Sequence, residues 1–226
     1  MLESGNKKIL IIVPHSDDEV LGCGGFIEKA IRYGNSVKVI VGAIGDTFHV
    51  HQKKIITSEV RKEELKNGLA VLGCTDFEIL YNGMDSLMDT VPQLEMVSLL
   101  DDIFARINPT IVLIPYPSFH QDHKAWFEAC MASLRPTEKK KQQMVAMYEY
   151  PNIIWQYPKL TDVGELYVDI TDSIDLKIEA LMKHESQIRN EGHPISPENV
   201  RQWAKGRGFE AGVQYAEKMH LLRLTI

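Results

Sequence analysis

Strand-like and helix-like segments alternate along the chain. Residues 8–14 contain the run Ile-Leu-Ile-Ile-Val, and such an uninterrupted apolar run is typical of a strand buried on both faces of a parallel sheet. A helix is expected over residues 19–33, a β-branched strand over 36–41 and a second helix over 57–72, and each of the two helices is followed by a glycine. The pattern is therefore a βαβα start.

The same alternation continues through the rest of the chain. The remaining expected segments, in order, are a strand over 77–81, a helix over 93–107, a strand over 110–115, a helix over 123–134, strands over 144–150 and 165–170, a helix over 173–188 and a last helix over 211–222. No repeat, low-complexity tract or linker rich in Pro, Gly and Ser divides the chain. The sequence predicts a single α/β domain over residues 1–226, Rossmann-like and doubly wound, with a mostly parallel sheet and helices on both faces.

Composition narrows the class of protein. Of the 226 residues, 44% are apolar and 25% are charged, as in an ordinary folded chain. The net charge of −6, with no basic stripe to offset it, argues against a nucleic-acid partner. The apolar run 9–13 is far shorter than the roughly 18 residues of a membrane span, and no signal-peptide pattern precedes it, so we expect a cytoplasmic protein without a membrane partner. Three cysteines without a C-x-x-C pair predict reduced, partly buried thiols.

In a doubly wound sheet, ligands bind at the carboxyl ends of the strands, and the loop after the first strand is chemically unusual there. It places His15, Asp17, Asp18 and Glu19 where a buried strand turns into a helix. Helix capping explains one or two of these acids but not the histidine. A divalent cation explains all of them, since imidazole and carboxylate are its usual ligands. His15 and Asp18 could converge on one ion and leave Asp17 free to take a proton.

Three glycines follow this loop and raise the alternative of a nucleotide site. Gly22, Gly24 and Gly25 lie inside the expected helix, the G-x-G-x-x-G spacing is absent, and acidic side chains would face the pyrophosphate. We therefore expect these glycines to allow close packing of the helix on the sheet.

A second cluster of possible ligands follows the fourth strand. His120, Asp122 and His123 come directly after residues 110–115. If the first and fourth strands are neighbours, as the doubly wound order requires, the two clusters face each other. Together they would supply three ligands of an open tetrahedral site and leave at least one acid and one histidine unligated.

These two segments resemble the signature motifs of a known family. Residues 14–19 with Gly22, and residues 120–123, are similar to the two motifs of the LmbE-like (PIG-L) metal-dependent N-deacetylases. Weaker supporting similarities are found at 61–64 with 72–73, at Lys177, Ala180, His184, Ser186 and Gln187, and at 207–208 with Gly212, Tyr215, Ala216 and Glu217. The chain departs from the family at Ser16, where proline is commonest, but every ligand position is filled.

The resemblance implies a role for seven residues. His15, Asp18 and His123 would hold the metal, and Asp17 would be the general base. His120 would assist at the oxyanion or the leaving group, and Asp122 would orient a histidine. Arg61 would contact sugar hydroxyls. Arg61 could instead pair with Glu59 or Glu64 on its own helix.

The resemblance also implies a reaction. A single zinc ion per chain, or ferrous iron, would activate water, and Asp17 would take its proton while the acetyl group of an N-acetylglucosamine-type sugar or conjugate is hydrolysed. A homo-oligomer, trimer or hexamer, is implied as well. The alternatives are a catalytically silent carbohydrate-binding or regulatory module and a metal-dependent amidase for a non-sugar or thiol-conjugate amide. A two-metal phosphoesterase would need more bridging carboxylates than these loops hold.

Four further polar residues have open roles. Asp46, at the end of the second strand, could touch the site or cap a helix or loop. His49 and His51 could line the mouth of the site, although a solvated loop histidine is the commoner case. His193 could form part of a lid over the pocket.

Overall fold

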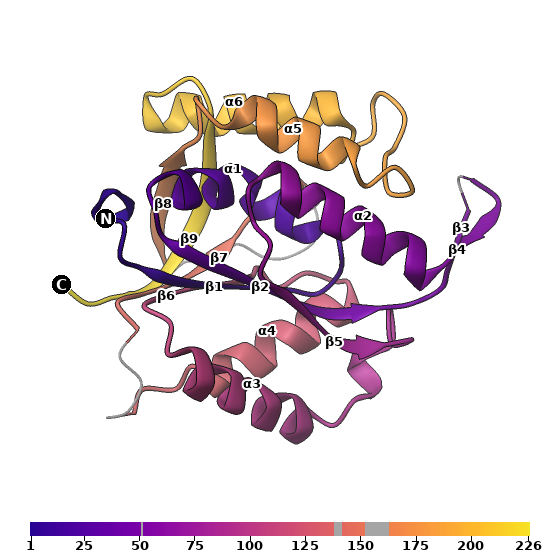
Figure 1. Cartoon of the computed structure of the whole chain (residues 1–226), viewed down its shortest axis with the longest axis horizontal. Helices are drawn as coiled ribbons and strands as arrows, with labels where there is room; N and C mark the ends of the chain where they lie inside the picture. Colours follow the sequence, from indigo (N-terminus) through magenta and orange to yellow (C-terminus); the bar gives the residue numbers. More distant parts are fainter. Residues whose placement is uncertain (51, 138–141, 152–162) are drawn as a thin grey trace.

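The computed structural model describes residues 1–50, 52–137, 142–151 and 163–226. Seven strands in the described part of the chain form one sheet in the order β5-β2-β1-β6-β7-β9-β8 (Figure 1). The strands of this sheet are β1 (Lys8–Val13), β2 (Ser36–Ile44), β5 (Phe77–Asn82), β6 (Ile111–Pro115), β7 (Met144–Tyr148), β8 (Gly164–Asp169) and β9 (Ala216–Leu224). The helices are α1 (Asp18–Arg32), α2 (Ser58–Val71), α3 (Gln93–Ile107), α4 (Gln121–Ser133), α5 (Ile174–Met182) and α6 (Pro197–Ala211), with short 3₁₀ turns at Leu2–Ser4 and Met88–Thr90.

Strand β1 is the middle one of the five parallel strands, and its apolar side chains are covered on both faces of the sheet. It pairs in parallel with β2 on one side and with β6 on the other, with Ile11 opposite Val39 and Leu113. The first and fourth strands are thus neighbours, as predicted. Only the far edge is antiparallel in the described sheet, where β9 pairs with β7 and β8.

Two helical layers cover the sheet (Figure 1). Helices α1, α2, α5 and α6 lie on one face, and α3 and α4 on the other. Alternate residues of β1 face alternate layers, as the two-residue repeat of a strand requires. Ile9 and Ile11 belong to the core under α1, while Leu10 and Ile12 belong to the core over α3 and α4. The predicted doubly wound α/β fold with a mostly parallel sheet is confirmed.

The predicted last helix over 211–222 is wrong. The helix lies earlier, as α6: Ser196 caps its start by accepting a hydrogen bond from the Asn199 amide, and Gly212, at φ 72°, ends it. The segment that follows is β9, inserted between β7 and β8. Strand pairing along both edges of β9 outweighs the helical preference of its local sequence. The helix predicted over 173–188 is also shorter, since α5 ends at Met182.

A short antiparallel hairpin, β3 (Thr47–His49) with β4 (Lys54–Ile56), forms where the sequence indicated a polar loop, and it projects beyond the body of the fold (Figure 1).

Within the described residues no helix has the length and apolarity required to span a bilayer. The cysteines Cys23, Cys74 and Cys130 are free and buried, as predicted.

Glycines let α1 approach the sheet closely. A Cβ at Gly22 would lie 2.2 Å from Cδ2 of Tyr148, and one at Gly25 would lie 2.6 Å from Cγ2 of Ile170. The expected packing role of these glycines is confirmed, and the approach holds the N-terminus of α1 against the strand ends.

Gly22→Ala should therefore destabilise the fold by about 1–3 kcal/mol, because the added methyl overpacks a rigid aromatic ring. Urea unfolding measures the free energy of unfolding. Gly206→Ala is the matched control, since a Cβ there meets nothing within 4 Å and alanine favours a helix interior by about 0.8–1 kcal/mol. Equal effects of the two substitutions would contradict the close approach of α1.

Candidate metal centre

Two chain segments about a hundred residues apart meet at the carboxyl ends of β1 and β6. His15 follows β1, Asp18 begins α1, and His123 lies in the first turn of α4. All three side chains are buried, and a ligand atom from each lies within 4.8 Å of the others. The parallel pairing of β1 with β6 brings these ligands together.

Adjacent carboxylates at the start of α1 serve different partners. Oδ2 of Asp18 accepts a hydrogen bond from the His15 amide at 3.1 Å and lies 3.3 Å from Nε2 of His123 and 3.5 Å from Nδ1 of His15. Asp17 occupies the N-cap position with φ 123°, a backbone conformation that costs a non-glycine residue about 1–3 kcal/mol. Its side chain makes no capping bond among the described residues and instead lines a pocket.

The three buried residues fit a divalent metal ion. Two imidazoles and one carboxylate form the donor set of an open zinc-type site, with room for a water or substrate atom. Nδ1 of His123 is buried and has no hydrogen-bond partner among the described residues. Burial by itself lowers the pKa of His15, but hydrogen bonds to Asp122 and Asp18 outweigh it and raise the pKa to about 10. A metal would therefore have to displace a proton from His15.

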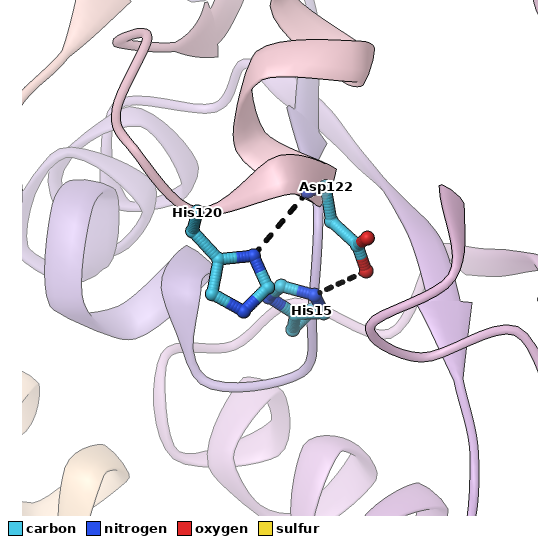
Figure 2. A group of neighbouring side chains, drawn as sticks. All are labelled: His15, His120 and Asp122. Carbon is cyan, nitrogen blue, oxygen red and sulfur yellow. Dashed lines mark hydrogen bonds and ion pairs between the residues drawn. The ribbon is translucent and has the colours of Figure 1, made fainter. Parts of the chain in front are cut away.

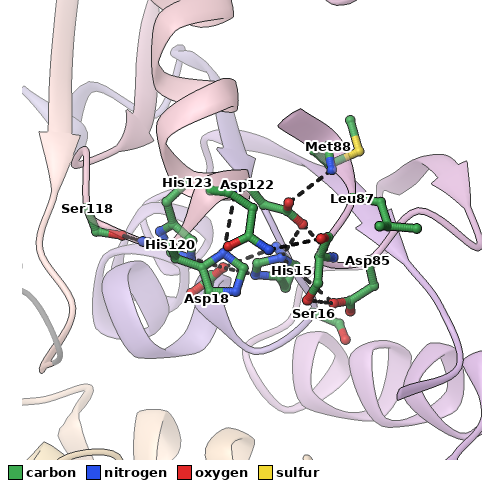
Figure 3. A network of polar contacts seen from close by, with 12 residues as sticks. His15, Ser16, Asp18, Asp85, Leu87, Met88, Ser118, His120, Asp122 and His123 are labelled. Atoms are coloured by element: carbon green, nitrogen blue, oxygen red, sulfur yellow. Dashed lines mark hydrogen bonds and ion pairs between the residues drawn. The ribbon is translucent and has the colours of Figure 1, made fainter. Parts of the chain in front are cut away.

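Asp122 holds His15 from the side opposite Asp18. Its Oδ2 lies 2.8 Å from Nε2 of His15 (Figure 2), which leaves Nδ1 of the ring facing Asp18. The Asp122 side chain is fully buried and accepts a hydrogen bond from the amide of Ser86 at 2.7 Å. It accepts another from the amide of Met88 at 2.9 Å (Figure 3). A carboxylate on the far nitrogen of a histidine is the usual way in which proteins orient a metal ligand.

His120 lies beside the two buried histidines as an uncharged ring. Its centroid is 4.8 Å from that of His15 and 5.4 Å from that of His123. Burial, together with the charges of His15 and His123, lowers the pKa of His120 to about 4. Its Nδ1 accepts a hydrogen bond from the Asp122 amide at 3.3 Å (Figure 2), so the proton of the neutral ring is on Nε2. His120 can thus donate a hydrogen bond without carrying a charge.

Asp17 has the opposite electrostatic environment to Asp18. Burial, and repulsion from the Asp18 carboxylate, raise the pKa of Asp17 to about 7. Burial would raise the pKa of Asp18 as well, but His123 and His15 hold it well below its usual range. Two neighbouring carboxylates with separated pKa values are typical of a site that moves protons near neutral pH.

Arg61 lines the same pocket, but it does not pair with a glutamate of its own helix. It forms an ion pair with Asp85 and donates a hydrogen bond to the carbonyl of Ser16 at 3.2 Å. The suggested pairing with Glu59 or Glu64 is wrong; Glu64 instead accepts hydrogen bonds from Ser186. Asp85 was not among the candidate residues of the sequence, although it follows β5 at the carboxyl edge of the sheet, where ligand-binding loops were expected.

The other candidate residues lie in different surroundings. Asp46 is exposed and caps α2 by accepting a hydrogen bond from the Ser58 amide at 2.7 Å, so of its two open roles the structure shows the cap and not the contact with the site. His49 is buried rather than solvated, with Nδ1 3.1 Å from the carbonyl of Ser186, and it lines the pocket. His51 lies outside the described residues. His193 is exposed and is not among the described residues that line the pocket.

The pocket has a volume of about 590 Å³ and opens directly over the possible metal ligands. Its floor contains His15, Asp17, Asp18, His120 and His123. Its walls come from the β3–β4 hairpin, from Arg61 with Asp85, from Gln187, which belongs to the weaker family similarities, and from residues that the sequence did not single out, namely Tyr150, Arg189 and Ile195. Those wall residues lie on irregular segments, where residue spacing gives no signal.

Known proteins match this chain over most of its length. The family model described as GlcNAc-PI de-N-acetylase (PIG-L) matches residues 10–134. A diacetylchitobiose deacetylase of Thermococcus kodakarensis is 28% identical over 227 residues, covering 93% of this chain and 81% of the relative. A probable N-acetyl-alpha-D-glucosaminyl L-malate deacetylase 2 of Bacillus cereus is 25% identical over 195 residues, covering 80% and 84%.

A solved structure shares the fold. The N,N'-diacetylchitobiose deacetylase from Pyrococcus horikoshii superposes with a TM-score of 0.76 at 23% identity, covering 96% of this chain and 84% of that chain. The likeness extends through the sheet and both helical layers.

We expect the protein to bind one divalent ion per chain, and binding should weaken as the pH falls because His15 must lose a proton. Calorimetric titration with Zn²⁺, together with elemental analysis, measures affinity and stoichiometry. His123→Ala should abolish high-affinity binding, whereas His193→Ala should bind as the unaltered chain does. Two tightly bound ions per chain, or binding that survives His123→Ala, would contradict the assignment.

Proposed function

The chain belongs to the PIG-L family, whose model matches residues 10–134 of its 226, and we propose that it is a metal-dependent N-deacetylase. The substrate would be an N-acetylglucosamine-type amino sugar or sugar conjugate, and the products acetate and the free amine. One observation carries this proposal: Asp17 lies beside the buried set His15, Asp18 and His123 in a single pocket.

The ligands would be His15, Asp18 and His123, with zinc or ferrous iron as the ion. Such an ion supplies a Lewis acid and lowers the pKa of a bound water to about 7 when it is present. The His15 ring would be held in place by Asp122, whose contact with Nε2 leaves Nδ1 available.

Amide hydrolysis also needs a group that moves a proton and a donor for the charge that develops on the carbonyl oxygen, and this chain has one of each. Asp17, with its pKa raised to about 7, would take the proton from water as the new carbon–oxygen bond forms. His120 would donate a hydrogen bond from Nε2 to the carbonyl oxygen as negative charge develops there. Protonated Asp17 would then return the proton to the amide nitrogen, so that the carbon–nitrogen bond breaks and a neutral amine leaves.

The sugar would be recognised on the wall formed by Arg61 and Asp85. A guanidinium fixed by a carboxylate offers a donor and an acceptor side by side, which suits neighbouring hydroxyl groups. The names of the relatives, diacetylchitobiose deacetylase and N-acetylglucosaminyl malate deacetylase, support an acetylated sugar as the substrate class. A trimer or hexamer remains a prediction from the resemblance.

Asp17→Asn should lower kcat by about 10²–10⁴-fold, because an amide cannot accept the proton of water. Acetate release from a panel of N-acetylated sugars and sugar conjugates measures this. Asp46→Asn is the matched control: asparagine also caps helices and residue 46 is exposed outside the pocket, so activity should be unchanged.

The same panel separates the alternatives. Sugar binding without acetate release from any compound would favour a silent carbohydrate-binding module. Acetate release from non-sugar amides alone would favour a general amidase. Release that persists in a fully chelated protein would contradict metal dependence.

Arg61→Lys should raise KM about tenfold and leave kcat nearly unchanged, because lysine keeps the charge but loses the planar fork that reaches both Asp85 and Ser16. Steady-state kinetics on the best substrate of the panel measures this. A fall in kcat at constant KM would instead place Arg61 in the chemical step.

A further inference from the structure

Two fully buried residues next to the pocket take no part in the proposed chemistry. Glu19 lies in the first turn of α1 and His184 follows the end of α5, and both have 0% exposed area. Nε2 of His184 lies 2.9 Å from Oε1 of Glu19. The other carboxylate oxygen, Oε2, accepts a hydrogen bond from the backbone amide of Asp17 at 2.9 Å. The pair thus connects the segment after α5 to the proposed general base.

The backbone of Asp17 needs such support. Its φ of 123° lies outside the regions that non-glycine residues favour. Its carbonyl is fixed by α1, where it accepts hydrogen bonds from the amides of Val20 at 3.1 Å and Leu21 at 2.9 Å. The Glu19 carboxylate fixes the amide on the other side. Together these contacts hold the peptide planes on both sides of Asp17, so its carboxylate faces the pocket while that of Asp18 faces the histidines.

Glu19 in turn needs a positive partner. A fully buried carboxylate is tolerated only when it is paired, and the Asp17 amide is a neutral donor. His184 is the basic side chain in contact with it. Burial lowers the pKa of His184, but the charge of Glu19 outweighs burial and raises it. The His184 ring is therefore the group placed to balance the carboxylate that holds Asp17.

A glycine and a second buried acid keep His184 in place. A Cβ at Gly68 of α2 would lie 2.8 Å from Nε2 of His184 and 3.2 Å from the carbonyl of Ala180, so α2 can pack here only without a side chain. Two residues after His184, Ser186 is fastened to α2 by Glu64, which accepts hydrogen bonds from its amide at 2.7 Å and its hydroxyl at 2.6 Å. The ring is therefore locked against Glu19.

We propose that His184 is a positioning residue for deacetylation: it holds the Glu19 carboxylate on the Asp17 amide and so aims the general base at the pocket. This role rests on the proposed function of Asp17. Neither His184 nor Glu19 touches the substrate or the metal in this arrangement.

Single substitutions test each contact between His184, Glu19 and Asp17 by their effect on kcat and KM. Glu19→Ala and His184→Ala should lower kcat about 10–100-fold, the range typical of residues that orient a reacting group, while KM stays within about twofold and each chain still binds one Zn²⁺. Glu19→Gln should recover about tenfold of the activity lost in Glu19→Ala, because its amide oxygen can still accept from the Asp17 amide. Gly68→Ala should resemble His184→Ala although alanine strengthens the helix.

The matched control is Glu28→Gln. Glu28 is another buried acid of α1, and it binds the Ser173 hydroxyl at the opposite end of α5, far from the pocket. This variant should match the unaltered enzyme in kcat. If Glu28→Gln and His184→Ala lower kcat equally, the effect is a general loosening of α1 against α5 and the proposal is overturned.

Hydrogen exchange at the Asp17 amide gives a readout that needs no substrate. Measured by NMR on the ¹⁵N-labelled, zinc-loaded protein, this amide should exchange at least tenfold faster in His184→Ala and Gly68→Ala than in the unaltered chain or Glu28→Gln. Unchanged exchange together with unchanged kcat would refute the positioning role. If the unaltered protein releases no acetate from any compound, the proposed function fails, yet accelerated exchange would still establish that His184 fixes Asp17.

Discussion

The burial of negative charge is the constraint on which this site depends. Three acids are consecutive at the start of α1, where the helix dipole favours each by only about 0.3–1 kcal/mol. Burying an unpaired carboxylate costs several kcal/mol, so each acid needs an arrangement of its own. Asp18 lies between His15 and His123, and Glu19 lies against a buried histidine. Asp17 faces the pocket with a raised pKa, so the acid that is costliest to ionise is the one placed to exchange a proton.

The sequence predicts the floor of this site because the floor follows from rules of topology. A strand buried on both faces must lie inside the sheet, its parallel neighbours must end at the same edge, and ligands at two such ends must meet. The pairing of β1 with β6 satisfies all three conditions. Residue type then indicates the chemistry, since clustered imidazoles and carboxylates at one sheet edge are ligands for a metal. Neither step depends on exact helix boundaries.

Features set by tertiary contact were not predictable in this way. Asp85 lies in an unremarkable loop and acquires its importance from Arg61, which belongs to a distant helix. The strand β9 has a helical local pattern, but the gap between β7 and β8 requires a strand there. Glu19 and His184 are far apart in the sequence and meet where Gly68 lets α2 pack against His184. In each case tertiary packing determines which segments meet, and the spacing of residues along the sequence does not indicate it.

The floor and the walls of the pocket are attached to different parts of the fold, and this difference affects how its substrate specificity can change. The floor is attached to the central strands and to helix starts, where a shift would expose or unpair several buried charges at once. The walls include the β3–β4 hairpin, which projects beyond the body of the fold and whose Phe48 and the adjoining Val50 are exposed. Loops of this kind tolerate substitution and insertion at little cost in stability. Chemistry that is fixed in the floor can therefore be combined with walls that suit different acetylated substrates.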